Sequence, residues 1–409
     1  MFAHPVLCRL LLVTLLILGG GSLRAQDAHE LSDMAEPMLL PPPAPVAVPS
    51  AGQLAGAQST TTTPYEISIL FLYTPDAVRL YGSEAAVKSR IDLIVSFANT
   101  AYSNSGIDLR IVKAATDLVY YDNANTTATA FSHLGNKTHP AFMGVNKRRM
   151  ETQADFVVLV RPQKADASVC GKAYFVGDVA NPATDYWTLG GYAYAHVSIN
   201  CYDFVLAHEL GHIMGLVHSR DAVGETNVGK SYPYASGYRV ANDFNTILAS
   251  TKGYPPPLAC CSYLPVFSSP AATCTGKSGV PKSCGVDSAL SNGADAVKAI
   301  NNIAAQLPRF SDDSDSDGMP DWFEHFWGLD RFNPADASGD IDGDGLTNLG
   351  EFHLETFARQ ISGLPKPAID TDGDGLLDGN DPFPTINGNP VLELNSPYAG
   401  SRIHEQVSP

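Results

Sequence analysis

The sequence has few basic residues, and its acidic residues are unevenly distributed. It contains 26 Lys and Arg against 43 Asp and Glu, which gives a formal net charge of −17. Between Ser311 and Asp381 there are 18 Asp and Glu but only three basic residues, so this stretch carries most of the negative charge. Such a stretch repels nucleic acids and anionic membranes and attracts cations. We therefore expect no nucleic-acid partner.

The sequence also lacks a hydrophobic segment long enough to span a membrane. The N-terminal apolar run, Leu10–Leu18, falls short of the roughly 20 residues that a transmembrane helix needs. Arg9 before the run, glycines after it and Ala25 as a cleavage point are typical of a signal peptide. We predict that residues 1–25 are a signal peptide, that the mature protein is secreted and extracellular, and that it has no transmembrane segment.

Two further segments have compositions that do not predict a packed core. Residues 26–64 are rich in Pro, Ala and Thr and contain no cysteine, which indicates a linker or a short pro-segment without a metal-blocking thiolate. Residues 386–409 are rich in Pro and Asn, and we expect a loosely ordered tail.

No C-x-x-C pair occurs among the cysteines, which argues against a cysteine zinc site. Cys8 lies in the predicted signal peptide and is removed when that peptide is cleaved. Six cysteines remain, an even number that predicts three disulfides in an exported protein. The sequence alone does not choose among the pairings of Cys170, Cys201, Cys260, Cys261, Cys274 and Cys284.

Strand and helix patterns alternate over residues 65–310 and predict one α/β or α+β domain. Apolar runs predict strands at Ile67–Tyr73, Ile107–Val112, Phe156–Val160 and Tyr192–Ile199, the last of them as the edge strand nearest the active site. Helical spacing predicts helices at Ser83–Ser103, Phe204–Gly215 and Ala294–Leu307. Asp203 is the predicted N-cap of the second helix.

The segment His208–His218 reads His-Glu-Leu-Gly-His-Ile-Met-Gly-Leu-Val-His. Residues four apart share one face of a helix, so His208 and His212 are predicted to bind one zinc ion, with Glu209 beside them as general base. Gly215 permits a sharp exit from the helix, which brings His218 back as the third ligand. Three protein ligands plus a water molecule are typical of catalytic zinc.

The extended motif resembles the long zinc motif of the metzincins, and its surroundings are similar to the reprolysin-like branch, including bacterial peptidyl-Asp metalloendopeptidases. The resemblance covers roughly Tyr65–Phe310. It is supported by Asp155–Val160, Cys170-Gly171, Ala173-Tyr174, Cys201, Gly237–Arg239 and Pro265–Pro270. It implies a twisted mixed sheet with long helices and a zinc cleft between two subdomains.

The sequence departs from this family at two positions. Metzincins have a methionine turn beneath the zinc, and the corresponding residue here is Leu248, since no Met occurs between Met214 and Met319. We expect Leu248 to fill the same space. Reprolysins usually have Asp after the third histidine, where this chain has Ser219.

These observations predict a secreted zinc endopeptidase that acts on protein or peptide substrates. In the predicted mechanism Glu209 accepts a proton from the attacking water and then delivers it to the leaving amine. The alternative hypothesis is a calcium-dependent surface or adhesion protein with an inactive peptidase-like domain. The intact Glu209 argues against this alternative.

Residues 311–385 contain three acidic segments with one spacing, in which oxygen ligands stand at loop positions 1, 3, 5, 9 and 12 and glycine at position 6. The repeated glycine favours Ca²⁺ loops over a solvated linker. The segments resemble thrombospondin type 3 repeats, which implies association with a cell surface or matrix. The predicted ligands are Asp313, Asp315, Asp317, Asp321 and Glu324; Asp340, Asp342, Asp344, Asn348 and Glu351; and Asp370, Asp372, Asp374, Asp378 and Asp381.

Overall fold

A computed structural model of the chain describes residues 63–163, 169–177, 185–221, 228–249, 261–343, 345–354 and 356, together with 372, 374, 376, 378, 381 and 383–386. The predicted signal peptide lies outside the described residues, as do nearly all of the predicted linker and tail. Within the described part, no helix has the length and apolar character needed to cross a bilayer.

A five-stranded mixed sheet forms the centre of the domain predicted over residues 65–310. Its strand order is β2-β1-β3-β5-β4. The first four of these strands pair in parallel, and β4 pairs antiparallel with β5 at the edge. The strands are β1 (Tyr65–Tyr73), β2 (Leu109–Leu118), β3 (Phe156–Arg161), β4 (Gly171–Ala173) and β5 (Tyr194–Ser198).

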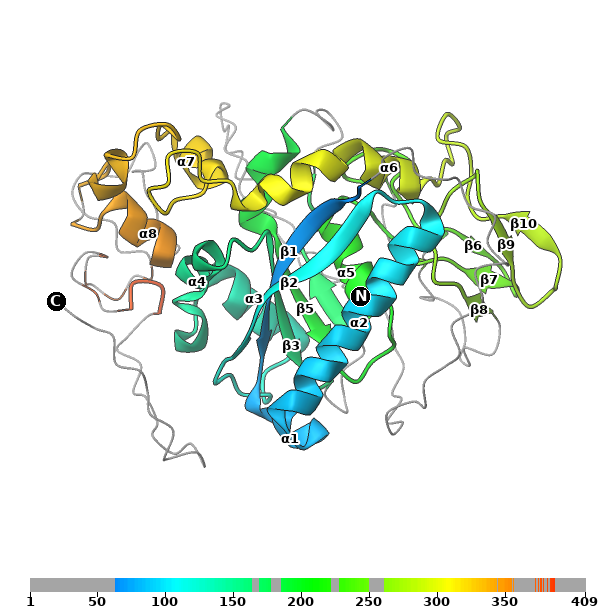
Figure 1. Cartoon of the computed structure of the whole chain (residues 1–409), viewed down its shortest axis with the longest axis horizontal. Helices are drawn as coiled ribbons and strands as arrows, with labels where there is room; N and C mark the ends of the chain where they lie inside the picture. Colours follow the sequence, from blue (N-terminus) through cyan, green and yellow to red (C-terminus); the bar gives the residue numbers. More distant parts are fainter. Residues whose placement is uncertain are drawn as a thin grey trace, which may run out of the picture. The chain divides into compact units, whose positions relative to one another are not determined.

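Helices cover both faces of the sheet, which explains why β3 and β5 are buried along their whole length. The larger core packs α2, α5 and α6 against one face, and a smaller core packs α3 and α4 against the other. Figure 1 shows α2 lying alongside β2. The helices are α1 (Pro75–Tyr81), α2 (Glu84–Ser105), α3 (Thr127–Asn136), α4 (Val145–Glu151), α5 (Val205–Ile213) and α6 (Ala296–Ile303), with the 3-10 helices η2 (Pro140–Phe142), η3 (Tyr186–Tyr192) and η5 (Ala304–Ser311).

The remaining described strands and helices are short. A three-stranded sheet has the order β6-β7-β8, and β9 and β10 form a hairpin. These strands are β6 (Arg239–Val240), β7 (Phe244–Asn245), β8 (Ser262–Tyr263), β9 (Thr273–Thr275) and β10 (Pro281–Ser283). The acidic region contributes α7 (Asp321–Trp327), η6 (Asp336–Ser338) and α8 (Asn348–Leu354).

The mixed α/β architecture confirms the predicted fold class, while three local predictions were wrong. Tyr194–Ser198 is not the edge strand, because the three-residue strand β4 pairs outside it. Asp203 does not cap α5; its carboxylate instead pairs with Arg90 of α2 at 2.6 Å. The predicted closing helix is shorter, since α6 ends at Ile303 and continues as the 3-10 helix η5.

Two of the three predicted disulfides are present in the described residues. Cys170 pairs with Cys201, and Cys274 pairs with Cys284. Cys260 lies outside the described residues, so the third disulfide stays a prediction.

Candidate metal centres

Helix α5 and the turn after it bring the three predicted histidines together. The Nε2 atom of His208 lies 3.2 Å from Nε2 of His212 and 3.2 Å from Nε2 of His218. All three side chains are buried, with exposed fractions of 2–5%. Tetrahedral coordination with zinc–nitrogen bonds of about 2.0–2.1 Å separates two ligand nitrogens by about 3.3–3.4 Å. The observed spacing therefore fits a zinc ion.

The turn that returns His218 to the site depends on Gly215. Its φ is +81°, and its N–H donates to the carbonyl of His212 at 2.9 Å, which ends α5. A Cβ atom at this position would lie 2.6 Å from both the backbone nitrogen and Oγ of Ser231. Both the backbone conformation and the space require glycine here.

The tautomer of His212 follows from its backbone contact. Its Nδ1 lies 2.9 Å from the carbonyl oxygen of Leu216, and since a carbonyl only accepts, Nδ1 carries the proton. Nε2 is then the lone-pair nitrogen that faces the other histidines, as a metal ligand requires. Phe175 packs against the His212 ring, with 4.3 Å between ring centroids. Burial, together with the neighbouring histidines, lowers the pKa of His208 well below its ordinary value.

Glu209 is buried beside the histidines and faces the edge strand. Its side chain is 5% exposed, and burial raises its pKa well above the ordinary value. A Cβ atom at Gly171 of β4 would lie 2.6 Å from the Glu209 carboxyl carbon, so glycine leaves the room that this side chain needs. The Cys170–Cys201 disulfide joins the start of β4 to the segment before α5. This cross-link fixes Gly171 relative to Glu209.

Leu248 lies under α5, the helix that carries His208 and His212 and that we call the zinc helix, at the predicted methionine-turn position. It is 1% exposed, and its Cδ2 would lie 2.8 Å from a Cβ atom at Gly211 of α5. Its carbonyl accepts the N–H of Ser219 at 3.2 Å, directly after His218. Leucine therefore supports both the helix and the returning segment.

A small pocket lies beside His208. Tyr202 and Tyr263 line it together with Leu248. The Tyr202 hydroxyl is buried and has no hydrogen-bond partner within the described part of the chain. The pocket therefore offers hydroxyl groups next to the candidate zinc site.

The first acidic segment gathers a cluster of carboxylates, which includes one residue that we did not predict. Carboxylate oxygens of Asp313, Asp315 and Asp317 lie within 4.8 Å of one another, as do those of Asp317, Glu324 and Asp336. We call these five residues the first acidic cluster. Asp336 falls outside the repeat spacing and belongs to η6, so the loop pattern gave no signal for it.

The first acidic cluster contains buried oxygens that lack partners. Glu324 is 0% exposed, and neither of its carboxylate oxygens has a hydrogen-bond partner among the described residues. Burial raises its pKa to about 8, and the charges of Asp317, Asp315 and Asp336 add to this effect. Burying a charged group without a partner is costly, so the cluster is suited to a cation.

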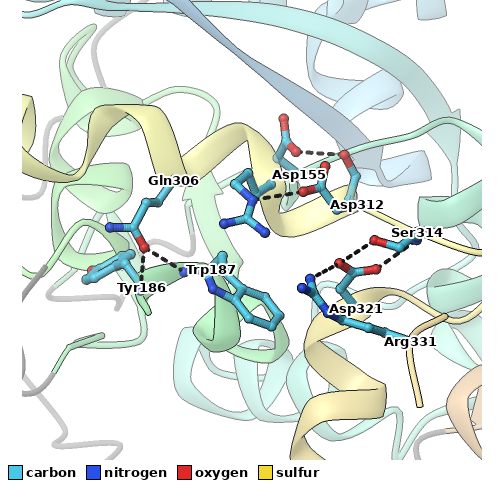
Figure 2. Close-up of polar contacts among 10 residues, drawn as sticks. Asp155, Tyr186, Trp187, Gln306, Asp312, Ser314, Asp321 and Arg331 are labelled. Atoms are coloured by element: carbon cyan, nitrogen blue, oxygen red, sulfur yellow. Dashed lines mark hydrogen bonds and ion pairs between the residues drawn. The ribbon is translucent and has the colours of Figure 1, made fainter. Parts of the chain in front are cut away.

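Asp321 lies next to this cluster but is not part of it. Its carboxylate accepts from Arg331 at 2.7 Å and from the Ser314 N–H and hydroxyl at 2.8 Å each. Figure 2 shows these contacts. Asn348, at the same position of the second segment, likewise accepts the N–H at loop position 2, which there belongs to Ile341, at 3.2 Å.

The second and third segments are described only in part. Asp340 accepts the N–H of Gly345 at 3.0 Å, as Asp313 accepts that of Gly318 at 3.0 Å, so the first two loops share a local conformation. In the second segment, Asp342 and Glu351 are buried. In the third segment, carboxylate oxygens of Asp372, Asp374 and Asp381 lie close together, and Asp378 is buried. Asp344 and Asp370 lie outside the described residues.

Comparisons with known proteins agree with the geometry of the histidine site. Residues 63–256 match the family described as metallo-peptidase family M12B, reprolysin-like. The peptidyl-Asp metalloendopeptidase of Pseudomonas aeruginosa is 28% identical over 268 residues, which cover 63% of this chain and 42% of that protein. The enzyme of the same name from Xanthomonas campestris is 30% identical over 206 residues, covering 49% and 45%.

A third protein of that name, from Stenotrophomonas maltophilia, is 28% identical over 186 residues, covering 45% of this chain and 40% of that protein. The chain thus spans less than half the length of these curated relatives. A solved structure titled "Structure of a chaperone-substrate complex" is 23% identical and covers 61% of this chain and 35% of that one, with a TM-score of 0.42.

Proposed function

Since residues 63–256 form a reprolysin-like domain of metallopeptidase family M12B, we propose that this protein is a secreted, zinc-dependent endopeptidase. The observation that carries the proposal is the spacing of the three histidine Nε2 atoms, which fits one zinc ion. His208, His212 and His218 are the proposed ligands. The two disulfides agree with export to an oxidising compartment.

Glu209 is the proposed general base. Zinc held by three histidines supplies Lewis acidity, which lowers the pKa of a water molecule that it contacts to about 7. Glu209 accepts a proton from the attacking water and then protonates the leaving amine. Gly171 and the Cys170–Cys201 disulfide keep the carboxylate in a buried position beside the ligands.

Protein or peptide substrates with aspartyl residues are the proposed substrate class, because the relatives carry the name peptidyl-Asp metalloendopeptidase. Tyr202 and Tyr263 lie beside His208, where their hydroxyl groups could meet a substrate. Hydroxyl groups donate hydrogen bonds, and such bonds to a carboxylate are among the stronger ones. Tyr202 and Tyr263 are the residues that we expect to contact the aspartyl side chain.

The acidic region is proposed to bind Ca²⁺ and to attach the enzyme to a cell surface or matrix. The buried oxygens of Glu324, which have no hydrogen-bond partner in the part of the chain that the structure describes, support a cation at the first acidic cluster, with Asp336 as an added ligand. Extracellular calcium modules bind with dissociation constants of about 10⁻⁴–10⁻³ M, so we expect loading outside the cell.

The proposed activity is tested by hydrolysis of a peptide that contains a single Asp, with the matched Asn peptide as control. The purified protein should cleave the Asp peptide, lose this activity with a zinc chelator in excess calcium, and regain it when zinc is added back. Cleavage that persists in the chelator would contradict the zinc mechanism. Equal cleavage of both peptides would contradict the substrate proposal alone.

A further inference from the structure

Helix η3 lies between the zinc helix and the acidic region and contacts both. It packs against α7, from the acidic region, and against η5. Its first residue, Tyr186, reaches the C-terminal end of α5, which carries two of the zinc-binding histidines. A displacement of η3 therefore changes the support of the zinc helix and the contact with the acidic region together.

The indole ring of Trp322, from α7, packs directly on two adjacent glycines of η3. A Cβ atom at Gly190 would lie 2.8 Å from Nε1 and 2.9 Å from Cγ of Trp322, and one at Gly191 would lie 2.9 Å from Cζ3. Any side chain at these positions would push the ring away. Trp322 is 6% exposed and belongs to an apolar cluster with Trp187 and Phe323.

Arginine side chains hold this aromatic contact in place. Arg149, 1% exposed, donates to the carbonyl of Gly190 at 2.9 Å. Arg331 lies 5.2 Å from the Trp187 ring and pairs with Asp321 of α7 at 2.7 Å. Figure 2 shows Trp187 beside this ion pair. The contact between η3 and α7 is thus apolar at its centre and charged around it.

Tyr186, the first residue of η3, contacts the C-terminal end of α5. The Tyr186 hydroxyl lies 2.6 Å from the carbonyl of Ile213, the last residue of α5, and 3.2 Å from the carbonyl of Val176. Val176 donates its own N–H to the carbonyl of His212 at 3.2 Å. Tyr186 therefore contacts both segments that fix the backbone around His212.

The first acidic cluster includes residues of α7 and of η6. Glu324 lies on α7, two residues after Trp322, and Asp336 comes from the later helix η6. Without a cation, the like charges of the cluster repel each other. A bound cation draws α7, the preceding loop and η6 together, and this arrangement keeps the Trp322 indole on η3.

We propose that cation binding at the first acidic cluster positions the zinc helix, and that Trp322 and Tyr186 are the positioning residues that carry this effect across η3. The inference rests on the proposed zinc and calcium sites. Because the two binding equilibria are linked, the effect is reciprocal. Calcium tightens zinc binding by a certain factor, and zinc tightens calcium binding by the same factor.

The chain provides its own spectroscopic probe of this contact. It has only three tryptophans, and Trp187, Trp322 and Trp327 all lie in the cluster between η3 and α7. Calcium added to the metal-free protein should shift their fluorescence to shorter wavelength as the indoles become buried. Glu324→Gln, which removes one charged ligand, should move this shift to a higher calcium concentration.

The deciding experiment measures the zinc dissociation constant of the full chain by competition with a coloured chelator, with and without calcium. We expect calcium to tighten zinc binding by about fivefold or more. Tyr186→Phe keeps the ring and removes the hydroxyl, so calcium should still shift the tryptophan emission but no longer tighten zinc binding. Gly190→Ala should also lose the effect, because its Cβ displaces Trp322.

Gly144→Ala is the matched control, since a Cβ atom there would meet nothing within 4 Å, and it should behave like the wild type. An unchanged zinc dissociation constant, in a protein whose tryptophan emission responds to calcium, would overturn the positioning proposal and leave the calcium site standing. An unaltered calcium effect in Gly190→Ala would overturn it as well. Absence of any calcium response would overturn both the calcium site and the positioning proposal.

Discussion

Replacement of Leu248 by Ala tests whether this residue supports the zinc helix from below. The leucine is 1% exposed, and core Leu→Ala substitutions cost about 2–5 kcal/mol, more where the surroundings cannot collapse. Here the facing residue of α5 is Gly211, which has no side chain to move into the space. We therefore expect a loss of roughly 3–5 kcal/mol.

A loss of this size is easily measured by thermal unfolding of the zinc-loaded protein. For a domain of roughly 150–250 residues, 1 kcal/mol corresponds to about 2–4 °C, so Leu248→Ala should lower Tm by roughly 6–20 °C. Leu248→Met, which conserves volume, should cost less than about 1.5 kcal/mol and restore the residue that metzincins have here. A Tm change below about 2 °C for Leu248→Ala would refute the packing argument.

A double-mutant cycle isolates the contact between the two residues. Gly211→Ala should destabilise the wild type, because its Cβ would lie 2.8 Å from Cδ2 of Leu248. The same substitution should cost less in the Leu248→Ala background, where that space is empty. Strictly additive effects would show that the two side chains do not meet.

Three further predictions concern other supports of the fold and site. Burial raises the pKa of Asp155 from its ordinary value near 3.8 to about 6, so the folded state loses stability as pH rises from about 4 to above 6; relative to Asp155→Asn, the unfolding free energy of the wild type should fall by about 2 kcal/mol between pH 4.5 and 7.5. Replacing Cys170 and Cys201 by Ser opens a loop with a sequence separation of 31, which should cost about 3–4 kcal/mol in chemical denaturation; a cost below about 1 kcal/mol would contradict this. Gly215→Ala combines a φ of +81° with overlap at Ser231, so zinc content after purification should fall severalfold, and full zinc retention would contradict the proposed turn.

Local patterns in the sequence predicted much of the fold. Ser83 and Gly106 bound α2 because their side-chain and backbone preferences act within a few residues, and the Ser83 hydroxyl accepts the N–H of Ala86 at 3.1 Å. The histidine cluster was likewise predictable, since helical spacing and one glycine turn define it. Such features need no knowledge of distant segments.

The failures involve partners that are distant in the chain. Asp203 pairs with Arg90, which lies 113 residues away, so its cap preference is overridden. Strand β4 has three residues, too few to show a period, and its pairing removed β5 from the sheet edge. Asp336 joins the first acidic cluster only through tertiary folding. The same holds for Tyr186, whose contact with the zinc helix has no sequence signal.

The most direct test of the zinc-peptidase mechanism is the activity of Glu209→Ala beside the wild type, with zinc content measured on the same samples. Because only the three histidines are the proposed zinc ligands, the variant should retain one zinc per chain while casein hydrolysis falls by a factor of about 10² or more. A zinc-loaded variant that hydrolyses casein at the wild-type rate would contradict the assignment of Glu209 as general base.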